Sequence, residues 1–319
     1  MADKLLFKNK SEQKFCSSKI SFRLLAVVLF LNTFTSFGQL SEVLSIQGNY
    51  SFSTDGCGTI GASCDIVIEK PADATTVFQV WAVVGRSSDF SPPATITPVT
   101  FNGSITPTFP NLVASSRYAN VTAEFSALFD SAIPGTSITI SSAEVDTTDT
   151  EGVSLYVVWN VPTAAQETII NLALGSVATS VGSNLTINYL NPVDTSVPGF
   201  SGYFGATLSF STGDAFQIST LTVNGTVVTT QLGGFDDSDS PAIIDGQLYT
   251  SGGTGDSITA NDNDELLDIT SQISNGDTSL IASTSSSHVF DYINGIYVVV
   301  VGAPRGVLCN SGPDGPSFN

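Results

Sequence analysis

Apolar and polar residues alternate along short stretches of this chain, and Gly, Pro, Asn and Asp separate the stretches. A period of two is typical of β-strands. Strands are predicted at residues 95–101, which alternate, and at 77–84, 153–161 and 296–301, where the apolar run is nearly continuous. A helical period is brief, at Val121, Phe125 and Leu128, and predicts a short helix over residues 121–131. The pattern favours an all-β fold with minor short helices.

One nine-residue segment occurs twice. Residues 96–104 match residues 218–226 at four identical positions, and each copy is an alternating strand that runs into Asn-Gly. Asn-Gly after such a strand is the strongest short hairpin signal. Two further similarities follow in the same order, between residues 120–122 and 268–270 and between 153–158 and 294–299. The repeated order predicts a duplicated module, two related β-sandwich domains of the jelly-roll or immunoglobulin-like type.

The N-terminus, residues 1–38, is typical of a secretory signal peptide. Basic residues precede the apolar run 24–34, and Ser36 and Gly38 supply small residues at positions −3 and −1 of a cleavage site. The run is too short to span a bilayer comfortably. We expect a secreted protein, extracellular or held at the cell surface, with no membrane insertion after signal cleavage.

Four parts are predicted to follow the signal peptide. They are an N-terminal cap at 39–70, a first β-sandwich module at 71–175, a second module at 178–303 and a linker-like tail at 304–319. The longest stretch without sustained periodicity is rich in Gly, Ser and Asp and lies at 233–263. Long loops of this kind are typically functional or mobile.

The chain is strongly acidic, with a formal net charge of −19. Removal of residues 1–38 leaves four basic residues against 27 acidic ones, a net charge of −23. Such a surface repels nucleic acids and anionic membranes, so we expect neither as a partner. The charge has two interpretations, solubility in a salty exterior and cation binding.

Cys57 and Cys64 enclose a loop of six residues. In an exported protein this spacing favours a disulfide, which stabilises by about 2–3 kcal/mol in the chain-entropy model. A zinc site is the alternative, but the chain has a single histidine. Cys309 is left over after this pairing and has three open interpretations: a free thiol, a disulfide between two chains, or a disulfide with a cysteine beyond this sequence.

Two acidic clusters provide candidate metal ligands. They are Asp236, Asp237 and Asp239, and Asp262, Asp264 and Glu265 with the neighbouring Asp268. Clustered carboxylates suit Ca²⁺, although neither cluster matches an EF-hand loop. The alternative is a solvated loop in the first case and a helix cap in the second. Calcium is the single cofactor that the sequence suggests.

Candidate catalytic residues are few. His288 is the only histidine, and it lies between Ser285-Ser286-Ser287 and Asp291. A Ser-His-Asp hydrolase would have to use it, but the sequence contains no Gly-x-Ser-x-Gly elbow. Acidic pairs for glycoside hydrolysis carry little weight in so acidic a chain. We therefore expect a protein that is not an enzyme.

The two tryptophans have a sugar-stacking interpretation and a core interpretation. Alternation places Trp159 on one face with Leu155 and Val157, and it places Trp81 with Val77, Gln79 and Val83. Both faces are mainly apolar, which favours the core. The repeat also predicts equivalent positions for Tyr156 and Tyr297, a packing requirement.

The order of these motifs resembles a family. An aromatic apolar strand, Thr-Phe-Asn-Gly, Asn-Val-Thr and Leu-Tyr-Val-Val-Trp are followed by Gly-Asp, Val-Asn-Gly, an acidic segment at 263–269 and Gly-Asp-Thr-Ser. Over residues 75–303 this is similar to uncharacterised extracellular tandem β-sandwich modules of bacterial and archaeal surface proteins. Flavobacterial members commonly precede gliding-motility-type C-terminal domains. The resemblance implies a surface or adhesin-like role and brings no catalytic residues.

Three functional hypotheses follow. The first is an exported, non-enzymatic, adhesin-like interaction module with a surface glycan or a protein as its ligand. The second is a carbohydrate-binding module, with or without bound calcium, and the third is a secreted hydrolase. The sequence leaves the ligand and the oligomeric state open.

Overall fold

The computed structural model describes residues 40–58, 63–86, 98–113, 116–144, 150–178, 184–211, 219–230, 232, 248–251, 266–286 and 292–303. All of them belong to one compact unit, Gly38–Asn319. The predicted signal peptide and the tail at 304–319 lie outside the described residues. Within the described part, no helix is long and apolar enough to cross a membrane.

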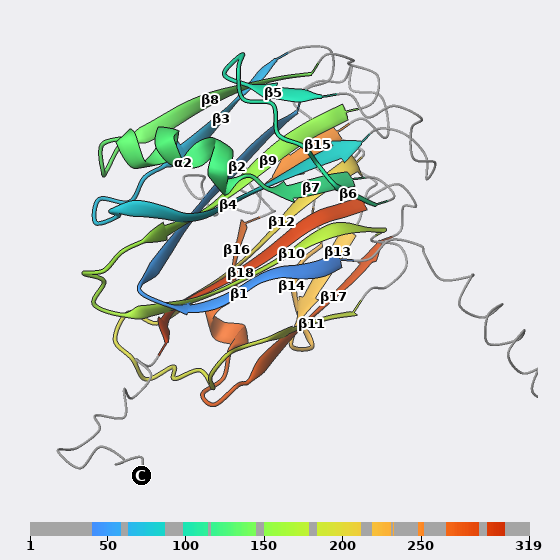
Figure 1. Cartoon of the computed structure of the whole chain (residues 1–319). Helices are drawn as coiled ribbons and strands as arrows, with labels where there is room; N and C mark the ends of the chain where they lie inside the picture. Colours follow the sequence, from blue (N-terminus) through green and yellow to red (C-terminus); the bar gives the residue numbers. More distant parts are fainter. Residues whose placement is uncertain are drawn as a thin grey trace, which may run out of the picture. The chain divides into compact units, whose positions relative to one another are not determined.

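The fold is all-β, as the alternation predicted, with four antiparallel sheets (Figure 1). Sheet A has the order β1 (Leu40–Gly48), β10 (Glu167–Ala178), β18 (Tyr292–Ala303), β12 (Ser201–Ser211) and β15 (Leu248–Ser251), and β16 (Leu266–Asp268) also pairs with β12. Sheet B has the order β2 (Tyr50–Gly58), β9 (Thr150–Asn160), β4 (Thr76–Arg86), β7 (Ser116–Asn120) and β6 (Asn111–Val113).

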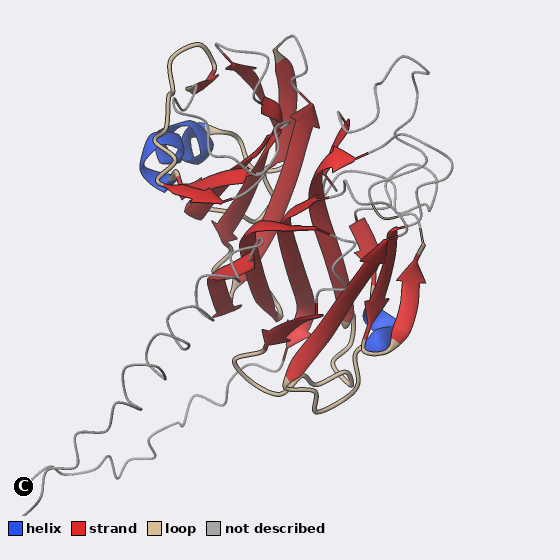
Figure 2. Ribbon diagram, turned by 90° about the vertical axis from the view of Figure 1, so that its right-hand side faces the viewer, coloured by secondary structure: helices blue, strands red, loops and turns tan. Residues whose placement is uncertain are grey.

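Two smaller sheets complete the structure. Sheet C has the order β3 (Cys64–Glu69), β8 (Ser137–Glu144) and β5 (Val99–Phe101). Sheet D has the order β11 (Asn184–Asn188), β17 (Ser279–Ser286), β13 (Ser219–Val223) and β14 (Thr226–Thr229). The described helices are α2 (Thr122–Ser131) and the short 3-10 helix η2 (Thr270–Gln272), drawn in blue among the red strands of Figure 2.

Three hydrophobic cores hold these sheets together. One core lies between sheets B and C, where Phe125 and Phe129 of α2 join it, and a second lies between sheets A and D. The third joins sheets A and B and contains Tyr156 and Tyr297. The layers therefore follow the order C, B, A, D, and the two inner sheets are covered on both faces.

Burial on both faces explains the nearly continuous apolar runs of the central strands. In β9, Leu155 and Trp159 enter the core against sheet C, while Tyr156 and Val158 enter the core against sheet A. A strand with one solvated face would alternate more strictly. The same arrangement applies to β18.

The N-terminal strands are distributed over three sheets. β1 pairs with β10 in sheet A, β2 pairs with β9 in sheet B, and β3 pairs with β8 in sheet C. The predicted cap at 39–70 thus contributes to three layers, and β10 pairs with β18. The division into a cap and two modules stays a prediction about independent folding units.

The two copies of the sequence repeat make the same polar contacts. Asn102 and Asn224 have φ values of 49° and 47°, in the left-handed region that Asn-Gly turns use. The Oδ1 atom of Asn102 accepts a hydrogen bond from Ser141 N at 3.0 Å, and that of Asn224 accepts one from Ile281 N at 2.9 Å. Each asparagine thus fixes its hairpin to the neighbouring strand.

The second similarity also has a repeated contact. Thr122 Oγ1 accepts a hydrogen bond from Val80 N, and Thr270 Oγ1 accepts one from Gly202 N, each at 2.9 Å. Helix α2 begins one residue later than predicted, at Thr122. The strand orders β3-β8-β5 and β11-β17-β13 also correspond. Descent of the halves from one duplicated module stays a prediction.

The ladders revise one predicted equivalence. Tyr156 is paired with Trp81, whereas Tyr297 is paired with Gly205. Thr122 contacts Val80 as Thr270 contacts Gly202, so Val80 and Gly202 are corresponding positions. Tyr156 lies opposite the first residue after Val80, and Tyr297 lies opposite the third residue after Gly202. The two tyrosines are therefore offset by two residues in the aligned halves. The prediction of equivalent positions is wrong, but a shift of two residues keeps both side chains on the same face of their sheets.

These two tyrosines fill the space between sheets A and B. Their ring centroids lie 6.2 Å apart in an edge-to-face arrangement, and Tyr156 Oη is 2.5 Å from Thr207 Oγ1. A Cβ atom at Gly205 would lie 1.9 Å from Cζ of Tyr297, and one at Gly295 would lie 2.3 Å from Oη of Tyr156. Both phenols therefore occupy space that a glycine leaves on the facing or neighbouring strand.

The Gly205→Ala substitution tests this packing. The added methyl group overlaps the Tyr297 ring, and we expect the free energy of unfolding to fall by about 1–3 kcal/mol. In a Tyr297→Ala background the ring is gone, so the same substitution should cost less than half as much. Urea unfolding of the four proteins measures the coupling. Additive costs would contradict the proposed contact.

The Tyr156→Phe substitution tests the buried phenol. Burial raises the pKa of Tyr156 well above its ordinary value of 10.0, and the hydrogen bond with Thr207 offsets only part of this rise. Above about pH 10 the unfolded phenol releases its proton and the native one does not, so stability falls as pH rises, by up to about 1.4 kcal/mol per pH unit.

We expect Tyr156→Phe to make this decline shallower in urea unfolding at pH 9, 10 and 11. Thr207→Val is the matched control, since it keeps the buried phenol and should keep the decline. Equal slopes for the wild-type protein and Tyr156→Phe would disprove the assignment.

Candidate functional site

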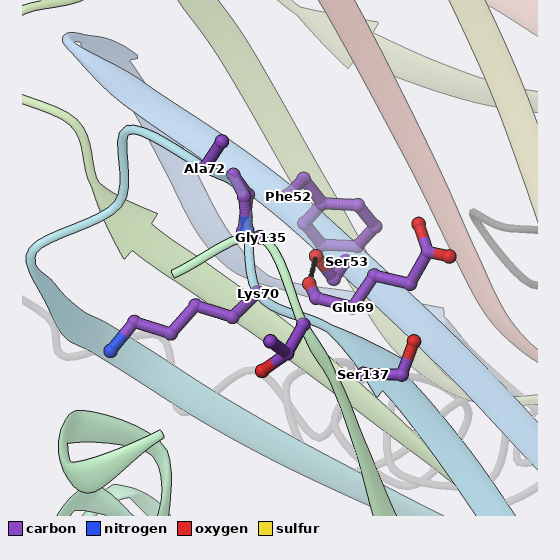
Figure 3. A pocket seen from close by; sticks show the side chains of 9 residues that line it. Phe52, Ser53, Glu69, Lys70, Ala72, Gly135 and Ser137 are labelled. Atoms are coloured by element: carbon purple, nitrogen blue, oxygen red, sulfur yellow. Dashed lines mark hydrogen bonds between the residues drawn. The ribbon is translucent and has the colours of Figure 1, made fainter. Parts of the chain in front are cut away.

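A hollow of about 380 Å³ lies at one edge of the sandwich formed by sheets B and C. Its lining comes from β2, from the end of β3 with the turn after it, and from the start of β8 (Figure 3). The lining residues are Phe52, Ser53, Glu69, Lys70, Pro71, Ala72, Gly135, Thr136 and Ser137.

Backbone hydrogen bonds between two turns form one wall of this hollow. Lys70 N donates to the carbonyl oxygen of Thr136 at 3.0 Å, and Gly135 N donates to that of Lys70 at 2.9 Å. Gly135 has a φ of 79°, a conformation that glycine adopts without steric cost. The local sequence Pro-Gly-Thr thus brings the start of β8 against the end of β3.

Lys70 lines the hollow but directs its ammonium group away from it. Its side chain and that of Glu69 extend in opposite directions (Figure 3). Lys70 Nζ donates to the carbonyl oxygens of Phe129, Asp130 and Ala132 at 3.0, 3.2 and 3.0 Å. It also lies 5.5 Å from the centroid of the Trp159 ring. The ammonium thus neutralises the negative C-terminal end of α2 and makes a cation–π contact with Trp159.

The hydroxyl groups of Ser53 and Thr136 are also engaged in the fold. Trp159 Nε1 donates to Ser53 Oγ at 3.0 Å, and Ser53 Oγ donates to the carbonyl oxygen of Glu69 at 2.5 Å. Thr136 Oγ1 donates to Ile133 O at 2.7 Å. Glu69 is exposed and is the one acidic side chain among the lining residues. The lining thus holds a single carboxylate, whereas glycoside hydrolysis uses a pair.

The predicted disulfide is confirmed. Cys57 and Cys64 are joined with an S–S distance of 2.02 Å and a Cα–Cα distance of 5.9 Å. The bond connects β2 of sheet B to β3 of sheet C. A second link reinforces it, since Val67 N of β3 donates to the Asp55 carboxylate of β2 at 2.6 Å. Cys309 lies outside the described residues.

The predicted calcium ligands lie outside the described residues. They are Asp236, Asp237, Asp239, Asp262, Asp264 and Glu265, and His288 is outside as well. Within the described ranges, no three His, Cys, Asp or Glu side chains lie close enough together to hold a metal ion. The calcium site therefore stays a prediction. The neighbouring Asp268 is described, and its Oδ1 accepts a hydrogen bond from Thr270 N at 2.8 Å, the turn-capping role of the alternative.

The ladder of β12 gives the second acidic cluster a context. Thr207 pairs with Ser251 of β15, and Gly205 pairs with Leu266 of β16. Two short strands thus follow one another along the same edge of β12. Residues 252–265, which hold the second cluster, separate them in the sequence.

The tryptophan predictions are partly confirmed. Trp159 is fully buried in the core between sheets B and C, as predicted. Trp81 is partly buried against the core between sheets A and B. Val77 does not share its face, because a β-bulge between Val77 and Gln79 shifts the alternation. Trp81 Nε1 donates to Gln79 Oε1 at 2.9 Å, which confirms that these two side chains lie together.

The role of Lys70 was missed by sequence reasoning, although a signal existed. Lys70 follows Ile66 and Ile68 at the spacing of one strand face, and both isoleucines are fully buried. A lysine in that series is directed toward the interior, where only 2% of its surface is exposed. The alternation therefore pointed to a buried cation, but its partners come from α2, some sixty positions further along the chain.

Comparisons with known proteins give distant similarities only. No protein-family model and no curated protein matches the chain. Among solved structures, a β-porphyranase of glycoside hydrolase family 86 from Bacteroides plebeius has a TM-score of 0.25 and 12% identity over 77% of this chain and 36% of that one. Peptide:N-glycanase F has a TM-score of 0.25 and 14% identity over 81% of this chain and 97% of that one.

The ANX2 ectodomain from Arabidopsis thaliana has a TM-score of 0.25 and 10% identity over 85% of this chain and 93% of that one. A BuGH86 variant in complex with neoagarooctaose has a TM-score of 0.27 and 8% identity over 81% of this chain and 35% of that one. All of these TM-scores are too low to indicate a shared fold or function.

The Lys70→Met substitution tests the structural role of the ammonium. It keeps the length of the side chain but removes three charge-assisted hydrogen bonds from the end of α2. We expect the free energy of unfolding to fall by about 2–3 kcal/mol. Glu69→Gln, at the exposed neighbouring position, should change it by less than about 0.5 kcal/mol. Urea unfolding measures both, and unchanged stability of Lys70→Met would show that α2 does not depend on this cation.

Proposed function

We propose that the chain is an exported, non-enzymatic interaction module with an adhesin-like role at the cell surface or in the medium. The Cys57–Cys64 disulfide carries this proposal, because such bonds persist in oxidising compartments. It agrees with the predicted signal peptide at residues 1–38 and with the acidic composition.

The described side chains support a binding role over catalysis. Lys70 is engaged at the end of α2, and Trp159 and Tyr156 are buried in packing. Exposed hydroxyl and amide side chains lie on the outer strands instead. Hydroxyl and amide groups on a rigid scaffold suit hydrogen bonding to a partner. The resemblance to flavobacterial surface modules supports the same proposal.

Cell fractionation tests the location. In its native host the protein should occur in the medium, or on intact cells in a form that added protease degrades, with Cys57 and Cys64 oxidised. A variant with Leu25→Arg and Val28→Arg interrupts the apolar run and should remain inside the cell with both thiols reduced. Wild-type protein retained inside with reduced thiols would overturn the export proposal. Hydrolysis of glycans or peptides by the purified protein would overturn the non-enzymatic part.

A further inference from the structure

The four strands of sheet D contain no charged residue, although the chain has 29 acidic residues and ten basic ones. Sheet D is an outer layer of the structure, formed by β11, β13, β14 and β17 (Figure 1). These strands are therefore neutral in a protein of net charge −19.

Alternation separates the two faces of this sheet. Ile187, Leu221 and Leu280 enter the core between sheets A and D. The side chains between these positions face outward, and nearly all are hydroxyls or amides. They are Asn184, Thr186, Asn188, Thr220, Thr222, Val227, Ser279, Ile281, Ser283 and Ser285. We call this set the sheet D outer face.

The polar groups form rows across the strands. Asn184 is paired with Ser283, which is paired in turn with Thr222, and Thr222 is paired with Val227. Ser283 Oγ donates to Asn184 Oδ1 at 2.5 Å. Neighbouring strands lie about 4.8 Å apart, so the rows present donors and acceptors at a regular spacing. Two apolar side chains interrupt them, Ile281 with 48% exposure and Val227 with 56%.

We propose that the sheet D outer face binds an uncharged polysaccharide. Sugar hydroxyls both donate and accept hydrogen bonds, as do the Ser, Thr and Asn side chains of this face. The absence of charge from these strands means that no ion has to be desolvated when the polymer docks. Ile281 and Val227 offer apolar contacts to the C–H faces of sugar rings. The proposal rests on the interaction role proposed above and names its partner.

Charge distinguishes this partner from the alternatives. A charged polymer would find no opposite charge on the face, and an anionic one would also be repelled by the rest of the protein. A peptide with large apolar side chains would meet hydroxyls around two isolated aliphatic groups. A neutral, hydroxyl-rich chain therefore complements the surface best.

Sheet C provides an internal comparison, because it occupies the corresponding place in the other half. Asp65 pairs with Ser141, and Thr186 pairs with Ile281. Since Asn102 and Asn224 contact Ser141 and Ile281 in the same way, Asp65 and Thr186 hold corresponding positions. The fold thus accommodates an exposed aspartate at this place, and the outer face of sheet C carries charge where that of sheet D does not.

The Thr186→Asp variant tests the proposal. Binding of the full-length secreted protein to amylose, agarose and cellulose is measured by depletion from solution, with alginate as the anionic comparison. We expect the wild-type protein to bind at least one of the neutral polymers and not alginate. Thr186→Asp should weaken that binding at least tenfold, while Thr139→Asp on the exposed face of sheet C should leave it unchanged. Urea unfolding checks that both variants fold.

Three results would overturn the proposal. The first is that the wild-type protein binds none of the neutral polymers. The second is that Thr186→Asp and Thr139→Asp weaken binding equally. The third is a change of mass in sedimentation caused by Thr186→Asp, which would show that a second copy of the chain covers the face. If the protein is exported but one of these three results is found, the polysaccharide proposal fails and the proposed interaction role stands. An intracellular location would remove the proposed function as well.

Discussion

The packing of two tyrosines between sheets A and B is the interaction on which the arrangement of the layers depends. Tyr156 and Tyr297 fill the third core, and glycine at 205 and 295 leaves room for their rings. The phenol of Tyr156 also meets the hydroxyl of Thr207 across the layers, so the contact is directional as well as apolar. Aromatic side chains bury large areas and prefer a defined geometry, which suits them to a single relative placement of two sheets.

This central contact determines what the remaining sheets can do. Because sheets A and B are covered on both faces, their central strands β9 and β18 are mostly apolar and buried. Within the described residues, sheets C and D pack against the core on one face, and their outer faces hold exposed side chains. Sheets C and D therefore offer the outer faces of strands to a partner, and the two differ in charge at Asp65 and Thr186.

The edge of the first sandwich is closed by a different set of contacts. The Cys57–Cys64 disulfide and the Asp55 carboxylate connect β2 to β3. Ser53 and Lys70 then join β3 and the turn after it to Trp159 and to the end of α2. These contacts satisfy polar groups that would otherwise be exposed at a sheet edge, and they leave the small hollow between β2 and β8.

The sequence alone determined the local features of this protein. Alternation identified the strands and the buried face of Trp159, and the cysteine spacing identified the disulfide. Asn-Gly identified the hairpin turns at Asn102 and Asn224, but another Asn-Gly, Asn294-Gly295, lies inside β18. These features depend on backbone sterics and short loops, so a few neighbouring residues suffice to specify them. The matching contacts of Asn102 and Asn224 show how far such local signals extend.

Only the tertiary structure decided which sheets the strands join and where the side chains meet. Alternation assigns a residue to a face but does not choose the partner strand, so the placement of β1 and β10 in sheet A was not predictable. The bulge after Val77 and the two-residue offset between Tyr156 and Tyr297 depend on pairing between distant strands. The neutral outer face of sheet D arises in the same way, because long-range pairing brings together four short strands that the sequence keeps apart.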